Sequence, residues 1–406
     1  MAVNLPMQPK PTAPAKWRQG EPRRVTILGS TGSVGCNTVD LIARRPEAYA
    51  VEALTARSNV RLLIEQALKL RPQLAVIADE ALYGDLKAGL AGTNIAVAAG
   101  QEALIEAAGL PADWVMAAIV GAAGLAPTLT AIKRGATIGL ANKECLVCAG
   151  DIVLREVRNN GATLLPVDSE HSAIFQVFDF DNVAAIERII LTASGGPFRT
   201  MDRAAMSKVT PAQAVAHPNW DMGAKISVDS ATMMNKGLEL IEAYYLFPLP
   251  AERIEILVHP QSVIHSMVGY SDGSVLAQMG MPDMRTPIAY ALAWPRRDGS
   301  PAARLDLAKI GTLTFEPPDP ERFPALKLAR EALQAGQGAP TVLNAANEIA
   351  VRGFLNGQIG FLDITRTVEQ TLASVPPMPA ETLDDVYRID ALARREAERI
   401  MARGKA

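Results

Sequence analysis

Short apolar runs alternate with stretches of helical spacing over the first half of the chain. The runs are residues 25–28, 51–54, 74–78, 95–98, 115–120, 137–140 and 163–165. Between them, apolar residues recur three and four positions apart, as at Val60, Leu63, Ile64, Ala67 and Leu68. Strands that alternate with helices of this length predict βαβ units and a parallel sheet covered on both faces. We therefore expect an α/β protein with an N-terminal doubly wound, Rossmann-like sheet.

The pattern changes after residue 295. Residues 296–322 are rich in Pro, Gly and charged residues, which is typical of a linker. Helical spacing then returns in four stretches, residues 326–333, 342–354, 365–372 and 383–402. This predicts a C-terminal α-helical bundle. Residues 343–348 form a polar insert on an otherwise apolar helix, which we interpret as helix–helix hydrogen bonding or an interface without chemistry of its own.

One stretch, residues 114–132, is uncharged and long enough to be compared with a membrane span. It contains Gly121, Gly124 and Pro127, so we predict a buried strand, a glycine turn and a helix start instead. Residues 1–22 lack the apolar stretch of a signal peptide and are expected to be a flexible tail. We expect no membrane partner.

The length, net charge and cysteine content of the chain limit the classes of function that it can have. The chain has 406 residues, enough for two or three domains, and a net charge of −3 from 40 basic and 43 acidic residues. A global basic field is absent, so we expect no nucleic-acid partner. Three cysteines are an odd and low number, which predicts a reducing, cytoplasmic compartment. We interpret Cys145 and Cys148, spaced C-x-x-C, as buried small hydrophobes on one helix.

A glycine-rich turn, Gly29-Ser30-Thr31-Gly32-Ser33-Val34-Gly35, directly follows the first apolar run. Its three glycines predict a tight turn, a close approach to a pyrophosphate and close helix–sheet packing. A plain structural turn is the alternative. No acid ends the second run, where Arg57, Ser58 and Asn59 offer donors for a 2′-phosphate. The sequence therefore favours NADPH, with a solvated loop charge as the alternative interpretation of Arg57.

Acidic residues form the second chemical signal. Asp168 and Glu170 follow a predicted strand end, and in an extended stretch they would face the same side. Without a cation, the two carboxylates would repel and one pKa would rise. Glu239 lies further along the chain, one turn into a predicted helix and on the face of Asn235. Three carboxylates suit Mg²⁺ or Mn²⁺, whereas a solvated acidic turn is the alternative for the first two.

Two further segments suit a phosphate. A predicted strand ends in Ser194-Gly195-Gly196, whose amides and hydroxyl can contact an anion. Asn235 and Lys236 stand at a helix start, which favours an anion as well. Residues 217–223 mix aromatic rings, Pro and Gly and are too polar for a core element, so we expect a mobile lid over residues 215–224. An ordinary loop with a packed Trp is the alternative.

As a set, these segments resemble the 1-deoxy-D-xylulose 5-phosphate reductoisomerase family. The resemblance covers the chain from about residue 24 and is carried by residues 29–35, 140–144, 165–171, 194–198, 217–222, 225–239, 259–265 and 343–348. It implies NADPH-dependent, divalent-metal-dependent rearrangement and reduction of 1-deoxy-D-xylulose 5-phosphate to 2-C-methyl-D-erythritol 4-phosphate, in the methylerythritol phosphate route to isoprenoids. It also implies a homodimer.

The resemblance also implies roles for individual residues. Cofactor-binding residues would be Thr31, Gly32, Ser33, Val34, Arg57, Ser58, Asn59, Asn142, Glu144 and Gly223. Metal ligands would be Asp168, Glu170 and Glu239. The phosphorylated sugar would contact Lys143, Ser169, Glu170, Ser194, His217, Ser230, Asn235, Lys236 and Glu239. The catalytic set would be Lys143, Asp168, Glu170, Glu239 and His217, with Trp220 and Met222 in the lid.

The expected organisation follows. We predict a tail at residues 1–22, an NADPH-binding domain at 23–167, a central α+β catalytic domain at 168–295, a linker at 296–322 and a helical domain at 323–406. Two alternatives remain open. One is another Rossmann-fold NADPH oxidoreductase, similar to a semialdehyde or homoserine dehydrogenase. The other is a non-enzymatic NADPH-sensing protein.

Overall fold

The computed structural model describes residues 21–216, 220 and 222–403. Its N-terminal part is a parallel sheet of seven strands in the order β4-β3-β2-β1-β5-β6-β7. The strands are β1 (Arg23–Leu28), β2 (Tyr49–Ala56), β3 (Leu74–Ile77), β4 (Ala96–Ala99), β5 (Trp114–Ala117), β6 (Thr137–Leu140) and β7 (Thr163–Pro166). Each lies at one of the seven predicted apolar runs, so the predicted sheet is confirmed.

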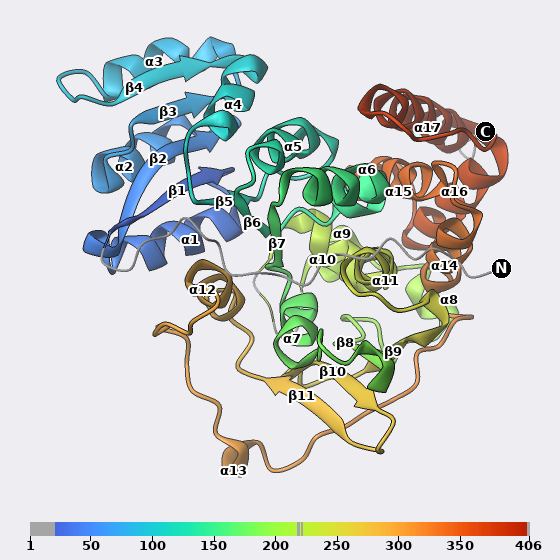
Figure 1. Ribbon diagram of the computed structural model, residues 1–406. Coiled ribbons are helices and arrows are strands. Elements are labelled where there is room, and N and C mark those ends of the chain that lie inside the picture. The colour runs from blue at the N-terminus through green and yellow to red at the C-terminus, as the bar shows by residue number, and fades with distance from the viewer. Residues whose placement is uncertain (1–20, 217–219, 221, 404–406) are drawn as a thin grey trace.

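Helices cover this sheet, as Figure 1 shows. They are α1 (Ser33–Ala43), α2 (Val60–Leu70), α3 (Tyr83–Gly89), α4 (Gly100–Gly109), α5 (Leu125–Lys133) and α6 (Glu144–Asn160). The strands are apolar along their length because both faces are covered: Val25, Ile27 and Leu28 of β1 are at most 1% exposed.

The strand order reverses at β1. The chain winds outward from β1 to β4 on one side and from β5 to β7 on the other. In open α/β sheets, ligands bind at the carboxyl ends of the strands where the order reverses. The turn that begins at Gly29 leaves β1 at this edge.

A second, mixed sheet follows. Its order is β11-β10-β8-β9, with β10 antiparallel to β8 and β11, and β8 parallel to β9. Its strands are β8 (Ile186–Ala193), β9 (Ile254–Val258), β10 (Ile264–Tyr270) and β11 (Val275–Met279). Around it lie α7 (Ser169–Val177), α8 (Arg203–Met206), α9 (Pro211–Val215), α10 (Ala224–Ala231), α11 (Met234–Leu246) and α12 (Arg285–Ala293).

A long segment connects α12 to the C-terminal helices and runs along the outside of the second sheet (Figure 1). It contains α13 (Leu307–Ile310) and is attached at Glu316, whose backbone exchanges hydrogen bonds with Val258. The helices that follow are α14 (Ala325–Ala335), α15 (Ala339–Leu355), α16 (Phe361–Ser374) and α17 (Leu383–Arg403), at the four predicted stretches. Of these, α14 packs against α11, and α15 against α6.

The uncharged stretch folds as predicted. It forms β5, a turn at Gly121 with φ of 75°, and the start of α5. Among the described residues, none of the helices combines the length and the apolar character that a bilayer crossing needs. Five single turns of 3-10 helix complete the described elements: η1 (Pro46–Ala48), η2 (Glu80–Leu82), η3 (Ala122–Gly124), η4 (Val183–Ala185) and η5 (Ala251–Arg253).

Candidate active site

The glycine-rich turn has the geometry that a dinucleotide site needs. Gly29 has φ of 85°, and a Cβ there would lie 2.7 Å from the Ala118 carbonyl oxygen. A Cβ at Gly35 would lie 2.2 Å from the Gly29 oxygen, so Gly35 allows α1 to pack onto the turn. Gly32 is different, because its nearest neighbour would be 3.5 Å away. The chain itself leaves room at Gly32, as expected where a ligand approaches the backbone.

The candidate 2′-phosphate residues lie at the carboxyl end of β2. Arg57, Ser58 and Asn59 are exposed there, and β2 is the neighbour of β1 in the sheet. Asn59 has a structural task as well, because its side-chain oxygen accepts from the Leu62 amide and caps α2. Glu52, the acid within this strand, is buried and pairs with Arg24 at 4.0 Å.

Asn142 follows β6 and hydrogen-bonds to the loop that follows β5. Its buried side-chain amide donates to the carbonyl oxygens of Ile119 at 2.5 Å and Gly121 at 3.1 Å. These residues follow β5, the strand beside β1. Asn142 therefore shapes the loop opposite the glycine turn, and Lys143 and Glu144 follow it directly into α6.

The three predicted metal ligands converge. One oxygen of each of Asp168, Glu170 and Glu239 lies within 4.8 Å of the others. Asp168 is the N-cap of α7 and accepts from the Glu170 amide at 3.2 Å. The two carboxylates therefore meet at the N-cap of a helix, rather than on one side of an extended stretch. The carboxylate set has the oxygen chemistry that Mg²⁺ or Mn²⁺ prefers.

Two lysines neutralise this cluster. The Lys143 ammonium donates to Asp168 at 2.8 Å, to the Asn235 side-chain oxygen at 2.8 Å and to Glu239 at 3.3 Å. Lys236 pairs with Glu239 and lies 3.9 Å from Glu170. The Asn235 amide donates to Glu239 at 2.5 Å, which places both on one helix face as predicted.

The carboxylates perturb one another as the sequence predicts. Burial and the neighbouring Glu239 and Asp168, against the opposing charge of Lys236, raise the pKa of Glu170 to about 8. Burial would raise the pKa of Asp168, but Lys143 and His171 hold it well below its usual range. Burial would lower the pKa of Lys143, but the surrounding carboxylates raise it well above its ordinary value.

Ser194 and Ser230 are brought close by a backbone contact. Gly195 and Gly196 follow β8 with φ of 82° and 69°. A Cβ at Gly196 would lie 2.7 Å from the Ser230 carbonyl oxygen in α10. Only glycine accepts both this conformation and this approach. Met233, with φ of 62°, then separates α10 from α11 and turns Asn235 and Lys236 into the same cavity.

These parts line one cavity of about 490 Å³. Predicted residues on its wall are Gly32, Ser33, Val34, Asn142, Lys143, Glu144, Asp168, Ser169, Glu170, Ser194, Trp220, Met222, Gly223, Ser230, Asn235, Lys236 and Glu239. Thr31 belongs to the same turn, whereas Arg57, Ser58 and Asn59 lie outside this wall at the end of β2. His217 lies outside the described residues, as do Pro218, Asn219 and Asp221 of the predicted lid.

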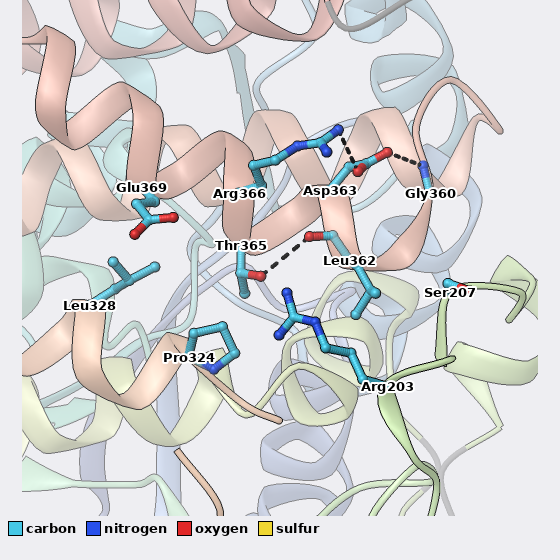
Figure 2. A pocket seen from close by; sticks show the side chains of 10 residues that line it. All are labelled: Arg203, Ser207, Pro324, Leu328, Gly360, Leu362, Asp363, Thr365, Arg366 and Glu369. Carbon is cyan, nitrogen blue, oxygen red and sulfur yellow. Dashed lines mark hydrogen bonds and ion pairs between the residues drawn. The ribbon is translucent and has the colours of Figure 1, made fainter. Parts of the chain in front are cut away.

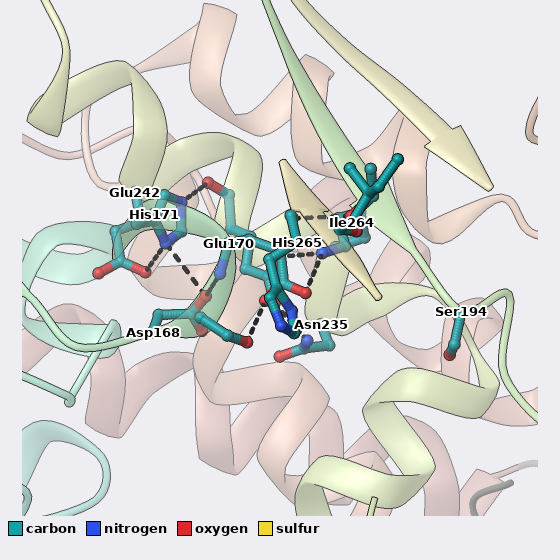
Figure 3. A network of polar contacts seen from close by, with 12 residues as sticks. Asp168, Glu170, His171, Ser194, Asn235, Glu242, Ile264 and His265 are labelled. Atoms are coloured by element: carbon teal, nitrogen blue, oxygen red, sulfur yellow. Dashed lines mark hydrogen bonds and ion pairs between the residues drawn. The ribbon is translucent and has the colours of Figure 1, made fainter. Parts of the chain in front are cut away.

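Sequence reasoning missed a buried network behind the carboxylates. His171 lies 3.1 Å from Glu242 and 3.4 Å from Asp168, and its Nε2 contacts the Glu239 carbonyl oxygen at 2.8 Å. Figure 3 shows His171 between Glu242 and Asp168, with Ser194 further away. Burial alone would lower the pKa of His171, but the two acids raise it well above its ordinary value. Helical spacing was the available signal, because Glu242 lies three residues after Glu239 on α11.

His265 was also missed. It is buried on β10, its ring lies 6.2 Å from the Trp220 ring, and Figure 3 shows it near Asn235. Burial lowers its pKa to about 4, so the ring is neutral at ordinary pH.

Cys145 and Cys148 are buried on one helix, as predicted. This helix is α6, and all three cysteines are free. Burial raises the pKa of Cys145 to about 12 and that of Cys148 well above its usual value. A thiol of this kind is not a nucleophile.

A second cavity, of about 410 Å³, lies between α8, α14 and α16 (Figure 2). Both of its arginines have partners within the protein: Arg366 pairs with Asp363 at 2.7 Å, and Arg203 donates to the Glu321 carbonyl oxygen at 3.1 Å. None of the predicted site residues lines it, and we assign it no chemistry.

Comparisons with known proteins identify the family. Family models described as 1-deoxy-D-xylulose 5-phosphate reductoisomerase match residues 25–150 and, for C-terminal domains, 164–247 and 279–396. The enzyme of that name from Rhodospirillum centenum is 66% identical, covering 94% of this chain and 95% of the relative. The one from Zymomonas mobilis is 59% identical, covering 94% and 98%.

Solved structures give the same result. The reductoisomerase from Zymomonas mobilis in complex with NADPH has a TM-score of 0.90 and 57% identity, covering 94% of this chain and 99% of that one. A reductoisomerase in complex with NADPH, fosmidomycin and magnesium has a TM-score of 0.89 and 43% identity, covering 94% and 99%. The chain belongs to the 1-deoxy-D-xylulose 5-phosphate reductoisomerase family.

Proposed function

We propose that the chain catalyses the NADPH-dependent rearrangement and reduction of 1-deoxy-D-xylulose 5-phosphate to 2-C-methyl-D-erythritol 4-phosphate, with a divalent cation. The observation that carries the proposal is one cavity walled by three convergent carboxylates and by the glycine-rich turn. A metal site and a nicotinamide site in the same cavity fit a reaction that both rearranges and reduces one sugar phosphate.

Asp168, Glu170 and Glu239 fit a divalent cation because they are close, nearly buried and mutually repulsive. When bound, Mg²⁺ or Mn²⁺ supplies Lewis acidity to the sugar oxygens. The protein contributes the positions of its ligands. The Asp168 cap and the Asn235–Glu239 hydrogen bond fix two of them, and Lys143 lies between the two where it can balance charge on a reacting oxygen.

The cofactor site is proposed at Thr31, Gly32, Ser33 and Val34, where the N-terminus of α1 would favour the pyrophosphate of the cofactor. Arg57, Ser58 and Asn59 are proposed to meet the 2′-phosphate, and Asn142, Glu144 and Gly223 to complete the wall. NADPH supplies the hydride of the reduction.

The phosphate of the sugar is proposed to lie with Ser194, Ser230, Asn235 and Lys236. It takes no part in the bonds that break and form, so its binding energy serves to orient the reacting carbons. Ser169 and His217 are proposed to contact the sugar as well, and residues 215–224 to cover it. The rearrangement itself breaks one carbon–carbon bond and forms another by a retro-aldol and aldol sequence.

The test is oxidation of NADPH, followed by absorbance, on adding 1-deoxy-D-xylulose 5-phosphate with and without a chelator. We expect turnover with Mg²⁺ or Mn²⁺ and its loss with chelator, restored by excess metal. Turnover of a semialdehyde or of homoserine without metal would favour the other oxidoreductases. A semialdehyde dehydrogenase needs a nucleophilic cysteine. The buried thiols of Cys145 and Cys148, whose pKa values are raised, do not suit that role. NADPH binding without turnover would favour a sensor.

We also propose a homodimer in the cytoplasm and the domain division 23–167, 168–295 and 323–406, joined by residues 296–322. Three free cysteines fit a reducing compartment. The dimer is supported by β11, an edge strand in the described part of the second sheet, where Val275 and Leu276 are 48% and 49% exposed.

A further inference from the structure

The polar insert of α15 reaches the wall of the catalytic cavity. Asn347 is fully buried, and its side-chain amide donates to Asp229 at 2.7 Å. Asp229 belongs to α10, is 1% exposed and lines the cavity. A helix of the C-terminal bundle, more than a hundred residues further along the chain, therefore holds a carboxylate of the central domain.

The contact continues to the N-terminal domain. The other oxygen of Asp229 pairs with the Lys225 ammonium at 2.8 Å, and Lys225 lies 3.5 Å from Glu144. Glu144 is the first residue of α6. One chain of polar contacts therefore joins α15, α10 and α6. Removing Asn347 would leave one oxygen of the buried Asp229 carboxylate without its hydrogen bond, which is costly even though Lys225 still balances the charge.

The joined elements carry different parts of the proposed site. Ser230 follows Asp229 directly and is proposed to contact the sugar phosphate. Glu144 lies on the proposed cofactor wall. The position of α10 relative to α6 therefore sets how the substrate side and the cofactor side of the cavity face each other. The hydrogen bond from Asn347 of α15 to Asp229 holds α10 in that position.

We propose that Asn347 is a positioning residue, whose hydrogen bond to Asp229 holds α10 in register with α6 so that the substrate and cofactor sides of the cavity align. The inference rests on the proposed function. It gives the polar insert of α15 a role beyond the helix packing expected from the sequence.

The test compares Asn347→Leu with Thr341→Val. Thr341 is a matched control: it lies on the same helix, is 1% exposed, and donates to the Cys148 carbonyl oxygen of α6 at 3.0 Å. Each variant removes one buried hydrogen bond of α15, so both lower the melting temperature. A kcat loss of roughly ten-fold or more, with both substrates saturating, is expected only for Asn347→Leu because misalignment slows the oriented reaction. Thr341→Val keeps kcat within about two-fold.

Hydrogen exchange gives a readout that does not depend on turnover. We expect faster exchange of the amides at residues 224–231 in Asn347→Leu and unchanged exchange there in Thr341→Val. Because Asn347 acts through Asp229, the kcat of Asp229→Ala and of Asp229→Ala with Asn347→Leu should agree within about two-fold. Asn347→Ser, which is too short to reach Asp229 and adds no bulk, replaces Asn347→Leu if that variant does not fold.

The proposal is overturned if Asn347→Leu and Thr341→Val lose the same kcat, or if exchange in α10 does not respond to Asn347. An unmodified chain that does not turn over 1-deoxy-D-xylulose 5-phosphate contradicts the proposed function instead, and the exchange measurement still decides whether Asn347 positions α10.

Discussion

Glu239 is the residue on which the candidate metal site depends most. It is 1% exposed and is contacted by Lys143, Asn235 and Lys236. Asp168 and Glu170 both come from the start of α7, whereas Glu239 is the carboxylate of this cluster that α11 supplies. A change at this position therefore tests the metal site with little change in shape.

We expect Glu239→Gln to reduce metal-dependent turnover by roughly 100-fold or more, because the amide supplies no charge to a divalent ion. The amide of the variant also places N–H groups beside the ammonium groups of Lys143 and Lys236. NADPH affinity, measured by fluorescence titration, serves as the control and should be unchanged, since Glu239 is remote in sequence and role from the glycine turn. Full activity at saturating Mg²⁺ would remove Glu239 from the ligand set.

The glycine turn allows a second prediction at single residues. Gly32→Ala should leave the free energy of unfolding within about 0.5 kcal/mol, since its Cβ would meet nothing closer than ordinary contact. The added methyl would occupy ligand space, so the dissociation constant for NADPH should rise roughly ten-fold or more. Denaturant titration and NADPH titration measure the two effects.

Gly35→Ala is the matched comparison, because its Cβ would overlap the backbone of Gly29 and Ser30. This variant should lose stability as well as NADPH binding. Equal behaviour of the two variants, in either direction, would contradict the assignment of ligand space to Gly32.

At the level of elements, the loop after β8 and the helix α10 depend on each other. Gly196→Ala should displace α10, because the new Cβ would lie 2.7 Å from the Ser230 oxygen. Gly273→Ala is the control: its φ is 87°, but nothing lies within 4 Å of its Cβ. Both variants should lose about 1 kcal/mol or more of stability from the left-handed backbone.

Enzymatic turnover should distinguish Gly196→Ala from Gly273→Ala. We expect kcat/KM for the sugar phosphate to fall by roughly ten-fold or more in Gly196→Ala and to stay near the unmodified value in Gly273→Ala. Steady-state kinetics measures the difference. If Gly273→Ala lost as much activity as Gly196→Ala, backbone strain alone would explain the effect and the contact with Ser230 would carry no function.

Elements were predictable where one physical signal dominated. Each strand of the first sheet is a continuous apolar run because both faces are covered, and the four C-terminal stretches keep helical spacing. In the second sheet, the sequence predicted the apolar end of β8, but β11 carries no comparable signal. In β11, Val275 and Leu276 are neighbours and both are about half exposed, so neither alternation nor a buried run marks the strand.

The sequence predicted those site residues whose chemical role can be recognised within one short segment. Asp168, Glu170 and Glu239 converge as expected. The buried pair of His171 and Glu242 was not predicted, because a single His and a single Glu within two helices do not indicate by themselves that their side chains meet. Asn347 was noticed as a polar residue on an apolar helix, but its partner Asp229 is 118 positions away. Pairings of this kind exist only once the fold brings the helices together.

At the scale of the whole molecule, β11 ends the described part of the second sheet. Its outer edge presents unpaired backbone groups beside two exposed apolar side chains, a combination that favours pairing with another chain. A second copy is the natural partner, because a two-fold axis at an edge strand makes the surface complementary to itself. The proposed homodimer therefore places β11 at its interface.

We expect the unmodified protein to be a dimer at micromolar concentration and Leu276→Asp to be a monomer, as measured by light scattering after size-exclusion chromatography. A charge in the interface would have to lose water without a partner, whereas it is fully hydrated in the monomer. Leu307→Asp on α13 is the matched control, because Leu307 is 56% exposed and lies outside the second sheet, so its charge should leave the dimer intact. If Leu276→Asp remains dimeric while the unmodified protein is dimeric, the interface lies elsewhere on the molecule. If the unmodified protein and Leu276→Asp are both monomers, the proposed dimer is wrong. The short length of β11 would then protect its exposed edge from pairing, and the active site would function within one chain.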